Sequence, residues 1–269
     1  MPEGHIVHAQ ARAITRAFGG KIVRVDSPQG RFRAGAAKVN GRELIRAEAV
    51  GKHLFIAFDN DRWIHVHLGL YGKWMFGTAP APAPRGEIRL RLRTPDQFAE
   101  LRGPTACELL DAEGVADVEA RIGPDPIRRD ADPDRAWQRV QRSRAPIGAV
   151  LMDQRTFAGV GNIYRAEVLF RHGISPFRPA DRLDRDDFDA MWADLVELMR
   201  LGVRRRRIDT VRPEHLPKAM GRAPRVDRHG GEVYVYRRTG DPCHVCGAAV
   251  AAEDLQGRHL YWCPRCQAN

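Results

Sequence analysis

The sequence predicts an α+β protein with a mostly β N-terminal unit, a helical middle part and a short cysteine-rich C-terminal ribbon. Short runs with strand character prevail over the first 115 residues, whereas helical spacing of apolar residues prevails over residues 134–202. Four of the five cysteines lie in the last 30 residues. We therefore expect three domains and one linker, at residues 1–115, 116–132 (the linker), 133–232 and 233–269.

The composition is that of a globular protein. The chain has 269 residues, of which 43% are hydrophobic and 29% charged, so it can bury a sizeable core. No stretch approaches the roughly 18 apolar residues that a membrane helix needs. The start, Met1-Pro2-Glu3-Gly4, has no basic or apolar run typical of a secretory signal. We expect a cytoplasmic bacterial protein with no membrane partner.

The charge balance points to a polyanionic partner. Lys and Arg number 44 against 34 Asp and Glu, which gives a formal net charge of +10. Codon bias in a GC-rich genome explains a preference for Arg over Lys as well as phosphate binding does, but it leaves the net charge unexplained. Residues 200–238 alone hold 12 basic and four acidic side chains. A basic protein of this size indicates a nucleic acid as partner.

The N-terminal unit begins with a helix and continues with strands. Apolar residues of the segment 5–18 recur at helical spacing, and Gly19-Gly20 ends the helix. The run 87–93 alternates Ile and Leu with three arginines, which predicts a half-buried strand with a basic outer face. Alternating Ala and Pro at 79–84 indicate an exposed loop. Further strands are expected at 22–25, 54–58 and 63–68.

The middle part changes from irregular to helical. Residues 111–133 are rich in Asp, Gly and Pro and show little periodicity, so we expect an irregular linker. Residues 203–232 are basic and punctuated by Gly and Pro, which predicts a partly mobile segment. Helices with plausible caps or breakers are expected at 134–142, 147–154, 162–172 and 185–201.

The last four cysteines form two C-x2-C pairs that predict a zinc site. Cys243 and Cys246 make one pair, Cys263 and Cys266 the other, and 16 residues separate the pairs. Tetrahedral Zn²⁺ takes four thiolates from this arrangement, and two disulfides are disfavoured in a reducing cytosol. Because cysteines fill all four positions, one structural Zn²⁺ is expected, with ribbon strands near 248–251 and 260–262. The fifth cysteine, Cys107, is expected to be a buried, small apolar side chain.

Two further motifs are ambiguous when each is taken alone. Gly159-Val160-Gly161 stands before a helical run, with Asn162 at the expected N-cap, and such a helix start binds phosphate. An ordinary helix–helix turn is the alternative, and it is favoured when the motif is taken alone. Removal of Met1 gives Pro2 a free secondary amine, which forms a cationic iminium with an aldehyde carbon and acts as a nucleophile near neutral pH. A proline at this position is also frequent in proteins without such chemistry.

Taken together, the ordered motifs resemble the formamidopyrimidine-DNA glycosylase/endonuclease VIII family of base-excision repair enzymes. The resemblance spans nearly the whole chain, from the N-terminal motif to the zinc ribbon. It implies an N-terminal β-sandwich, a helix-two-turn-helix domain and a zinc finger. The motifs are Met1-Pro2-Glu3-Gly4, Gly51-Lys52, His67-Leu68-Gly69-Leu70-Tyr71-Gly72, Arg121-Ile122-Gly123-Pro124-Asp125, the segment 153–165 and the four cysteines.

The resemblance also implies the roles of individual residues. Pro2 matches the nucleophile that attacks the sugar C1′, and Glu3 matches the acid that protonates the sugar oxygen. Lys52 matches the lysine assigned to β-elimination. Arg258 matches the zinc-finger arginine that grips phosphates and supports δ-elimination. The phosphate-binding positions are matched by Gly161, Asn162 and Arg121.

The loop after His67 carries the expected contact with the duplex interior. An enzyme that flips a base out of the stack must fill the gap, and Leu70-Tyr71 at a hairpin tip match this wedge. A core pair at a strand end is the alternative. Met-Pro-Glu-Gly and Leu-Tyr resemble the endonuclease VIII branch, which implies oxidised pyrimidines as lesions. Gly69 stands where the well-known bacterial enzyme has a glutamine, so that minor-groove contact is missing here.

Two functions from different classes remain at this point. The first is a monomeric bifunctional DNA glycosylase and AP lyase that acts on damaged double-stranded DNA and cleaves it by β,δ-elimination. The second is a catalytically silent zinc-finger relative that only binds DNA. A protein of the second kind has no need of Pro2, Glu3 and Lys52 together, so the sequence favours the enzyme.

Overall fold

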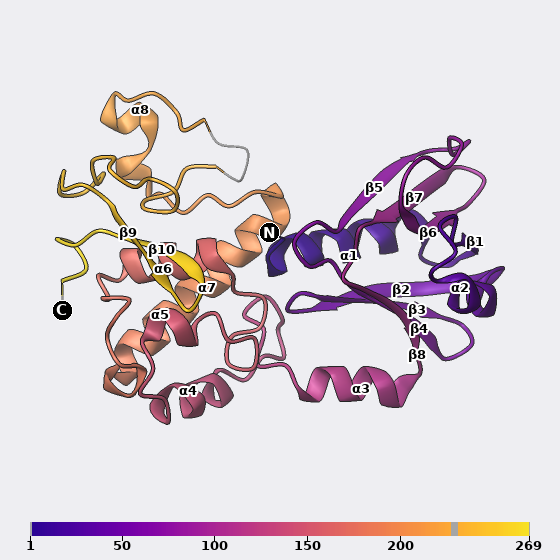
Figure 1. The fold of residues 1–269 in the computed structure, drawn as a ribbon, viewed down its shortest axis with the longest axis horizontal. Helices are drawn as coiled ribbons and strands as arrows, with labels where there is room; N and C mark the ends of the chain where they lie inside the picture. The colour runs from indigo at the N-terminus through magenta and orange to yellow at the C-terminus, as the bar shows by residue number, and fades with distance from the viewer. Residues whose placement is uncertain (1, 227–230, 269) are drawn as a thin grey trace. The chain divides into compact units, whose positions relative to one another are not determined.

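The computed structural model describes residues 2–226 and 231–268, and it divides into two compact units, Met1–Arg121 and Ile122–Asn269. Unit 1 contains the strands β1–β8 and the helices α1–α3, whereas unit 2 contains the remaining helices and a two-stranded hairpin (Figure 1). The α+β class predicted from the sequence is confirmed. Met1 and residues 227–230 of the basic segment lie outside the described residues.

Unit 1 is built on eight antiparallel strands in the order β5-β7-β6-β1-β2-β3-β4-β8. β1 pairs with β6 on one side and with β2 on the other, so it joins two layers, which are seen above and below α1 in Figure 1. The strands are β1 Lys21–Asp26, β2 Arg42–Val50, β3 His53–Phe58, β4 Arg62–His67, β5 Lys73–Thr78, β6 Ile88–Arg93, β7 Gln97–Arg102 and β8 Ala106–Leu110.

One apolar core holds the two layers and the leading helix together. α1 (Gly4–Phe18) places one buried stripe, including Val7, Ile14 and Phe18, against β2 and β3. Leu92 and Leu101 from the other layer belong to the same core. This common core is the physical basis of the sandwich, because neither layer buries its apolar face alone.

The run 87–93 departs from its predicted pattern. β6 buries Ile88, Leu90 and Leu92 as expected, but Arg91 is also buried, with 4% of its surface exposed. Its guanidinium pairs with Glu100 of β7, which is 1% exposed. The expected outer face of three arginines is therefore wrong, because a buried carboxylate on the neighbouring strand draws one arginine inward.

Unit 1 ends with a helix where an irregular linker was expected. α3 (Ala112–Ala120) begins at Asp111, whose carboxylate accepts a hydrogen bond from the Gly114 amide at 3.0 Å. None of the residues of α3 is buried, and its apolar residues form only a weak helical pattern. The spacing of apolar residues in the sequence therefore did not predict this helix. The short helix α2 (Arg33–Val39) and the strands β2, β5, β7 and β8 were also not predicted.

Unit 2 is helical with the hairpin near its end. α4 and α6 match the predicted helices, α7 is longer at its C-terminus, and α5 covers only the first part of 147–154. Arg171 of α6 and Asp194 of α7 form a bidentate ion pair with N···O distances of 2.6 and 2.7 Å. The helices are α4 Pro133–Gln141, α5 Ile147–Val150, α6 Asn162–Arg171, η1 Ala180–Arg182, α7 Arg185–Arg205, η2 Pro213–His215 and α8 Pro217–Met220.

The hairpin near the C-terminus consists of β9 (Ala251–Leu255) and β10 (Arg258–Trp262). β10 lies close to its predicted place, but the first strand begins where 248–251 was expected to end. Gln256 and Gly257 form the two-residue turn, both with positive φ (51° and 73°), which suits the twist of a tight hairpin.

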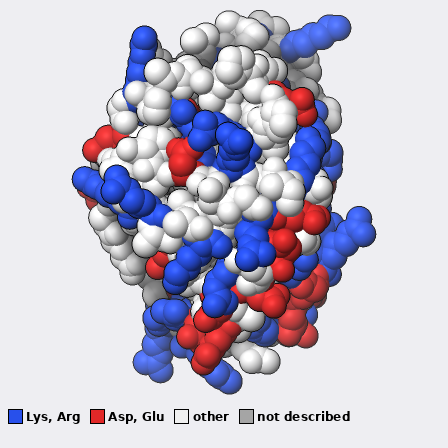
Figure 2. All heavy atoms as spheres, turned by 90° about the vertical axis from the view of Figure 1, so that its right-hand side faces the viewer, with Lys and Arg blue, Asp and Glu red and all other residues white. Residues whose placement is uncertain are grey.

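Charge on the outer surface is mixed. On the face in Figure 2, Lys and Arg side chains project over most of the surface, and Asp and Glu gather toward its lower part. Within the described part of the chain, no helix has the length and apolar character needed to cross a membrane.

Candidate functional site

Pro2 and Glu3 lie directly before the first helix of unit 1. Glu3 is extended (φ −103°, ψ 173°) and its carbonyl accepts a hydrogen bond from the Ile6 amide at 3.0 Å, which starts α1. Its side chain does not cap the helix and is only 3% exposed, whereas Pro2 is half-buried. Burying a carboxylate costs free energy, and the positive end of the helix dipole offsets part of this cost. The burial thus holds the Glu3 carboxylate in a defined place at the start of α1.

Lys52 lies at the tip of the hairpin between β2 and β3. Val50 pairs with His53, so Gly51 and Lys52 form a two-residue turn. Gly51 has φ +59°, the conformation that such a turn requires at its first position. The glycine thus places the following lysine at the tip, half-buried, in the same unit as Pro2 and Glu3.

Leu70 and Tyr71 occupy the loop between β4 and β5. They are 57% and 85% exposed, so the alternative of a core pair does not hold. The loop needs its glycines, because a Cβ on Gly69 (φ +65°) would lie 1.8 Å from Thr105 Oγ1 and one on Gly72 would lie 2.3 Å from the Leu68 carbonyl oxygen. Two exposed apolar side chains on a sharply bent loop are suited to entering a duplex, and the wedge stays a prediction.

A row of histidines runs along the strands that follow Lys52. The Nδ1 of His53 lies 2.9 Å from the Nε2 of His65, and the Nδ1 of His65 lies 2.8 Å from the Oε1 of Glu108. His67 packs at a ring-centroid distance of 4.9 Å from His53. The sequence reasoning missed this group, although the motif His65-Val66-His67 signals two histidines on one face of a strand.

Arg121 is the last residue of unit 1. It follows α3, is exposed, and donates from Nε to the Asp117 carbonyl at 2.8 Å. Its charge contributes to lowering the pKa of His53. The charges of Arg121 and Lys52 thus both act on His53, and the phosphate contact of Arg121 stays a prediction.

In unit 2, the start of α6 is tied to the hairpin. Asn162 is the first residue of the helix and Gly161 is its N-cap, so the expected N-cap position of Asn162 is wrong by one residue. Its side chain does not cap the helix: the Nδ2 of Asn162 donates to the His259 carbonyl of β10 at 2.9 Å. Arg165, 1% exposed, donates to the same carbonyl at 3.0 Å and also contacts Asn162. These bonds anchor the residue next to Arg258, which is exposed at the start of β10.

A second anchor holds the chain that leads into the ribbon. Glu167 of α6 has no exposed surface and accepts hydrogen bonds from the backbone amides of Tyr234, Val235 and Tyr236 at 2.7 to 2.9 Å. The Thr210 hydroxyl donates to the same carboxylate at 2.5 Å. An acid in a helical pattern is usually a surface residue, so no local pattern indicates this role.

The four predicted zinc ligands converge. The Sγ atoms of Cys243, Cys246, Cys263 and Cys266 all lie within 4.8 Å of one another. The pairs Cys246–Cys263 and Cys243–Cys266 are 3.4 and 3.9 Å apart, near the S···S separation of about 3.8 Å that tetrahedral Zn–S bonds produce. The donor set fits one Zn²⁺ and leaves no open position. The fifth cysteine, Cys107, packs against the unit 1 core, where burial raises its pKa to about 12.

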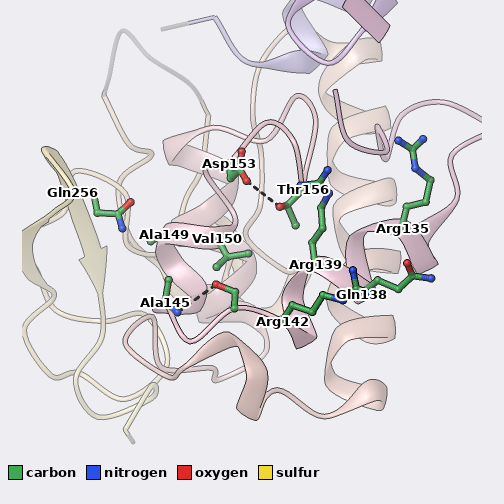
Figure 3. A pocket seen from close by; sticks show the side chains of 11 residues that line it. Arg135, Gln138, Arg139, Arg142, Ala145, Ala149, Val150, Asp153, Thr156 and Gln256 are labelled. Atoms are coloured by element: carbon green, nitrogen blue, oxygen red, sulfur yellow. Dashed lines mark hydrogen bonds between the residues drawn. The ribbon is translucent and has the colours of Figure 1, made fainter. Parts of the chain in front are cut away.

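A basic pocket of about 670 Å³ lies beside α4 and α5 in unit 2 (Figure 3). Arg135, Arg139 and Arg142 line it from one side of α4, and none of them forms an ion pair with any residue that the structure describes. Asp153 also lines it, with its carboxylate accepting from the Thr156 hydroxyl at 3.1 Å. The excess of unpaired guanidinium groups favours an anion at this surface.

Comparisons with known families match three parts of the chain. Residues 1–105 match the formamidopyrimidine-DNA glycosylase N-terminal domain, residues 122–212 its H2TH domain, and residues 240–269 the zinc finger found in FPG and IleRS. The last match agrees with the four converging thiolates, so the chain has one structural zinc site.

Relatives and solved structures extend over the whole chain. "Endonuclease 8 1" of Mycobacterium tuberculosis (strain ATCC 25618 / H37Rv) is 50% identical over 274 residues, which cover 99% of this chain and 100% of the relative. "Endonuclease 8" of Pectobacterium carotovorum is 28% identical over 277 residues, with coverage of 99% and 100%. Wild-type Lactococcus lactis Fpg in complex with DNA containing N7-benzyl-Fapy-dG has the same fold, with a TM-score of 0.80, 23% identity and full coverage of both chains. The chain therefore belongs to the formamidopyrimidine-DNA glycosylase/endonuclease VIII family, a family of base-excision repair DNA glycosylases.

Proposed function

We propose that this DNA glycosylase is bifunctional: it excises an oxidised pyrimidine from double-stranded DNA and then cleaves the strand as an AP lyase. The observation that carries the proposal is the pair Pro2-Glu3, a potential secondary-amine nucleophile followed by a carboxylate that is 3% exposed. The names of the relatives, Endonuclease 8, support the endonuclease VIII branch and its pyrimidine lesions.

The chemistry begins with the free amine of Pro2. Its nitrogen attacks C1′ of the flipped nucleotide, and the proton that this nitrogen loses goes to the base as the bond from C1′ to the base breaks. Glu3 delivers a proton to the ring oxygen as the bond from C1′ to that oxygen opens. The product is a cationic iminium on C1′, which draws electrons from C2′. Loss of the C2′ proton, served by Lys52, then expels the 3′ phosphate.

A second elimination, in which the C4′ proton is lost, removes the 5′ phosphate. Arg258 supplies a fixed positive charge to that phosphate as it leaves, which favours its departure. Water hydrolyses the iminium and restores the Pro2 amine. Gly161, Asn162 and Arg121 hold neighbouring phosphates, and Leu70-Tyr71 fill the space left by the flipped nucleotide. The protein acts as a monomer in the cytoplasm.

Trapping with sodium borohydride on a duplex with an abasic site tests this function. The reagent reduces the iminium, so active protein is expected to form a covalent adduct through residue 2. Mass analysis of the active protein is expected to show that Met1 has been removed. A form with a blocked N-terminus serves as control: it is expected to bind the duplex without forming an adduct.

The alternative function predicts a different result. A catalytically silent zinc-finger relative binds the lesion duplex but gives no adduct in either form. Active protein that retains Met1 would contradict the role of the Pro2 amine, because its nitrogen would be part of a peptide bond.

A further inference from the structure

Four polar or charged side chains share one face of the sheet formed by β3, β4 and β8. His53 pairs with His67 across β3 and β4, and His65 pairs with Glu108 across β4 and β8. The intervening residues, including Leu54 and Val66, point into the core of unit 1. These four side chains therefore lie on the face turned away from the core, immediately after the Lys52 turn.

When the rings of His53 and His65 are both neutral, the two hydrogen bonds of this group have a fixed direction of donation, from His53 through His65 to Glu108. The Glu108 carboxylate only accepts, so the Nδ1 of His65 carries a proton and donates to it at 2.8 Å. The Nε2 of His65 is then unprotonated and accepts from the Nδ1 of His53 at 2.9 Å. As a result, the Nε2 of His53 carries a lone pair. That nitrogen is neither hydrogen-bonded nor sealed from solvent among the described residues.

Two positively charged side chains act on His53, at one end of this hydrogen-bonded group. Burial first, then the neighbouring rings of His65 and His67, and then Lys52 and Arg121, lower the pKa of His53 to about 3. Burial, His65 and Lys52 also lower the pKa of His67. The positive charge of Lys52 thus acts on rings that burial keeps neutral, and the negative charge of Glu108 is at the far end of the group.

We propose that Glu108 and His65 are positioning residues that fix the tautomer of His53, so that its unprotonated Nε2 is kept available as a hydrogen-bond acceptor for the Lys52 ammonium group. This inference rests on the proposed function, in which Lys52 serves β-elimination. Without Glu108, no acceptor holds a proton on the Nδ1 of His65, so the direction of donation between His53 and His65 is no longer fixed. His53 can then carry its proton on Nε2. It then offers Lys52 a donor in place of an acceptor, and the lysine loses this acceptor.

Three variants distinguish the effect of the hydrogen-bond direction from that of the Glu108 charge and from a general loss of protein stability. Glu108→Ala removes the acceptor, whereas Glu108→Gln removes the charge but keeps an amide oxygen that accepts from His65. Glu48→Ala is the matched control, because the side chains of Glu48 and Glu108 are both 54% exposed and each is paired with one basic group. Glu48 lies on β2 of the same layer, where it pairs with Arg46.

Two measurements at pH 7.5 test the proposal. Nitrogen-15 NMR, with the His53 signal assigned by His53→Gln, reports the tautomer and needs no activity. Single-turnover cleavage of a preformed abasic-site duplex reports the elimination. Glu108→Ala is expected to move the His53 proton from Nδ1 to Nε2 and to slow cleavage about tenfold, as for one hydrogen bond to a charged group. Duplex affinity is expected to stay unchanged, and Glu108→Gln and Glu48→Ala to behave as the native protein.

The outcomes distinguish this proposal from the proposed function. An unchanged tautomer in Glu108→Ala, or a changed tautomer with native cleavage, overturns the positioning role. Equal slowing in Glu108→Gln also overturns it, because the charge and not the direction would then matter. A native protein that fails to cleave the abasic duplex rejects the proposed function, while the NMR result still decides the tautomer.

Discussion

At the scale of single residues, the proposed catalytic groups of the two units are held in place by different interactions. Glu3 is fixed by burial at the start of α1. Lys52 is fixed by a glycine that alone tolerates the turn. Arg258 is exposed, but its neighbour His259 is bound through its carbonyl by Asn162 and Arg165. The backbone beside this long charged side chain is thus held in place.

Glu3→Gln is expected to reduce base excision by roughly 10²-fold or more, as for loss of a general acid. Cleavage of a ready-made abasic site is expected to fall much less, because that substrate has already lost its base. The measurement compares single-turnover rates on lesion and abasic duplexes. Equal losses on both substrates would assign Glu3 to the eliminations or to the fold.

Arg258→Ala is expected to weaken binding of a lesion duplex and to shift products from β,δ- toward β-elimination. Loss of one phosphate contact lowers the slope of log K against log salt by about 0.9. Salt titrations and product gels measure the two effects. Arg265→Ala, another exposed arginine of the ribbon, is the control, and both variants must retain zinc. A native salt slope together with a native product ratio would show that Arg258 contributes neither to phosphate binding nor to the second elimination.

At the scale of elements, the ribbon depends on its metal and on α6. Its cysteines belong to a small core with Ala166, Phe170, Val235 and Val250. That core contains few apolar side chains, so most of the folding free energy of the ribbon has to come from Zn–S bonds. The Glu167 carboxylate also fixes the segment that leads into the ribbon, because it accepts hydrogen bonds from the backbone amides of Val235 and Tyr236.

Removal of zinc by a chelator, or Cys263→Ser, is expected to abolish DNA binding while unit 1 stays folded. The hairpin that carries Arg258 loses its order, whereas the core of unit 1 contains no zinc ligand. Circular dichroism, zinc content and duplex affinity are the measurements. Native affinity in a metal-free sample would show that the ribbon is dispensable for binding.

At the scale of the whole molecule, stability is expected to depend on histidines that stay neutral. Burial lowers the pKa of His5 to about 3, with a smaller contribution from His8, and the pKa of His53 is likewise about 3. The unfolded chain binds protons on these rings below about pH 6.5, but the folded chain does not. The unfolding free energy of unit 1 therefore falls as the pH falls from 6.5 toward 3.

The size of this effect follows from linkage. Each ring contributes at most about 1.4 kcal/mol per pH unit, and His53 contributes less because solvent partly reaches it. Urea unfolding at pH 7.5 and 5.5 measures the change. His5→Phe, which keeps a ring of similar shape, is expected to flatten the dependence. An unchanged pH dependence in this variant would show that His5 is not the source.

Local patterns gave much of the architecture. The spacing of the cysteines predicted the metal centre, and helical periodicity predicted α1, α4, α6 and most of α7, because these signals depend on residues close together in the chain. The same reasoning missed α3, whose pattern carries no buried stripe. It also missed β2, β5, β7 and β8, whose partners come from elsewhere in the sheet.

The sequence by itself determined which residues are chemically competent: the amine of Pro2, the carboxylate of Glu3, the ammonium of Lys52 and four thiolates. Only the tertiary structure decided how other groups surround them. His65 and Glu108 are 43 residues apart, and Asn162 and the His259 carbonyl are 97 apart. Such pairs meet through sheet register and packing between elements, where burial turns a polar side chain from a surface residue into an obligatory hydrogen-bond partner. No local pattern in the chain encodes that choice.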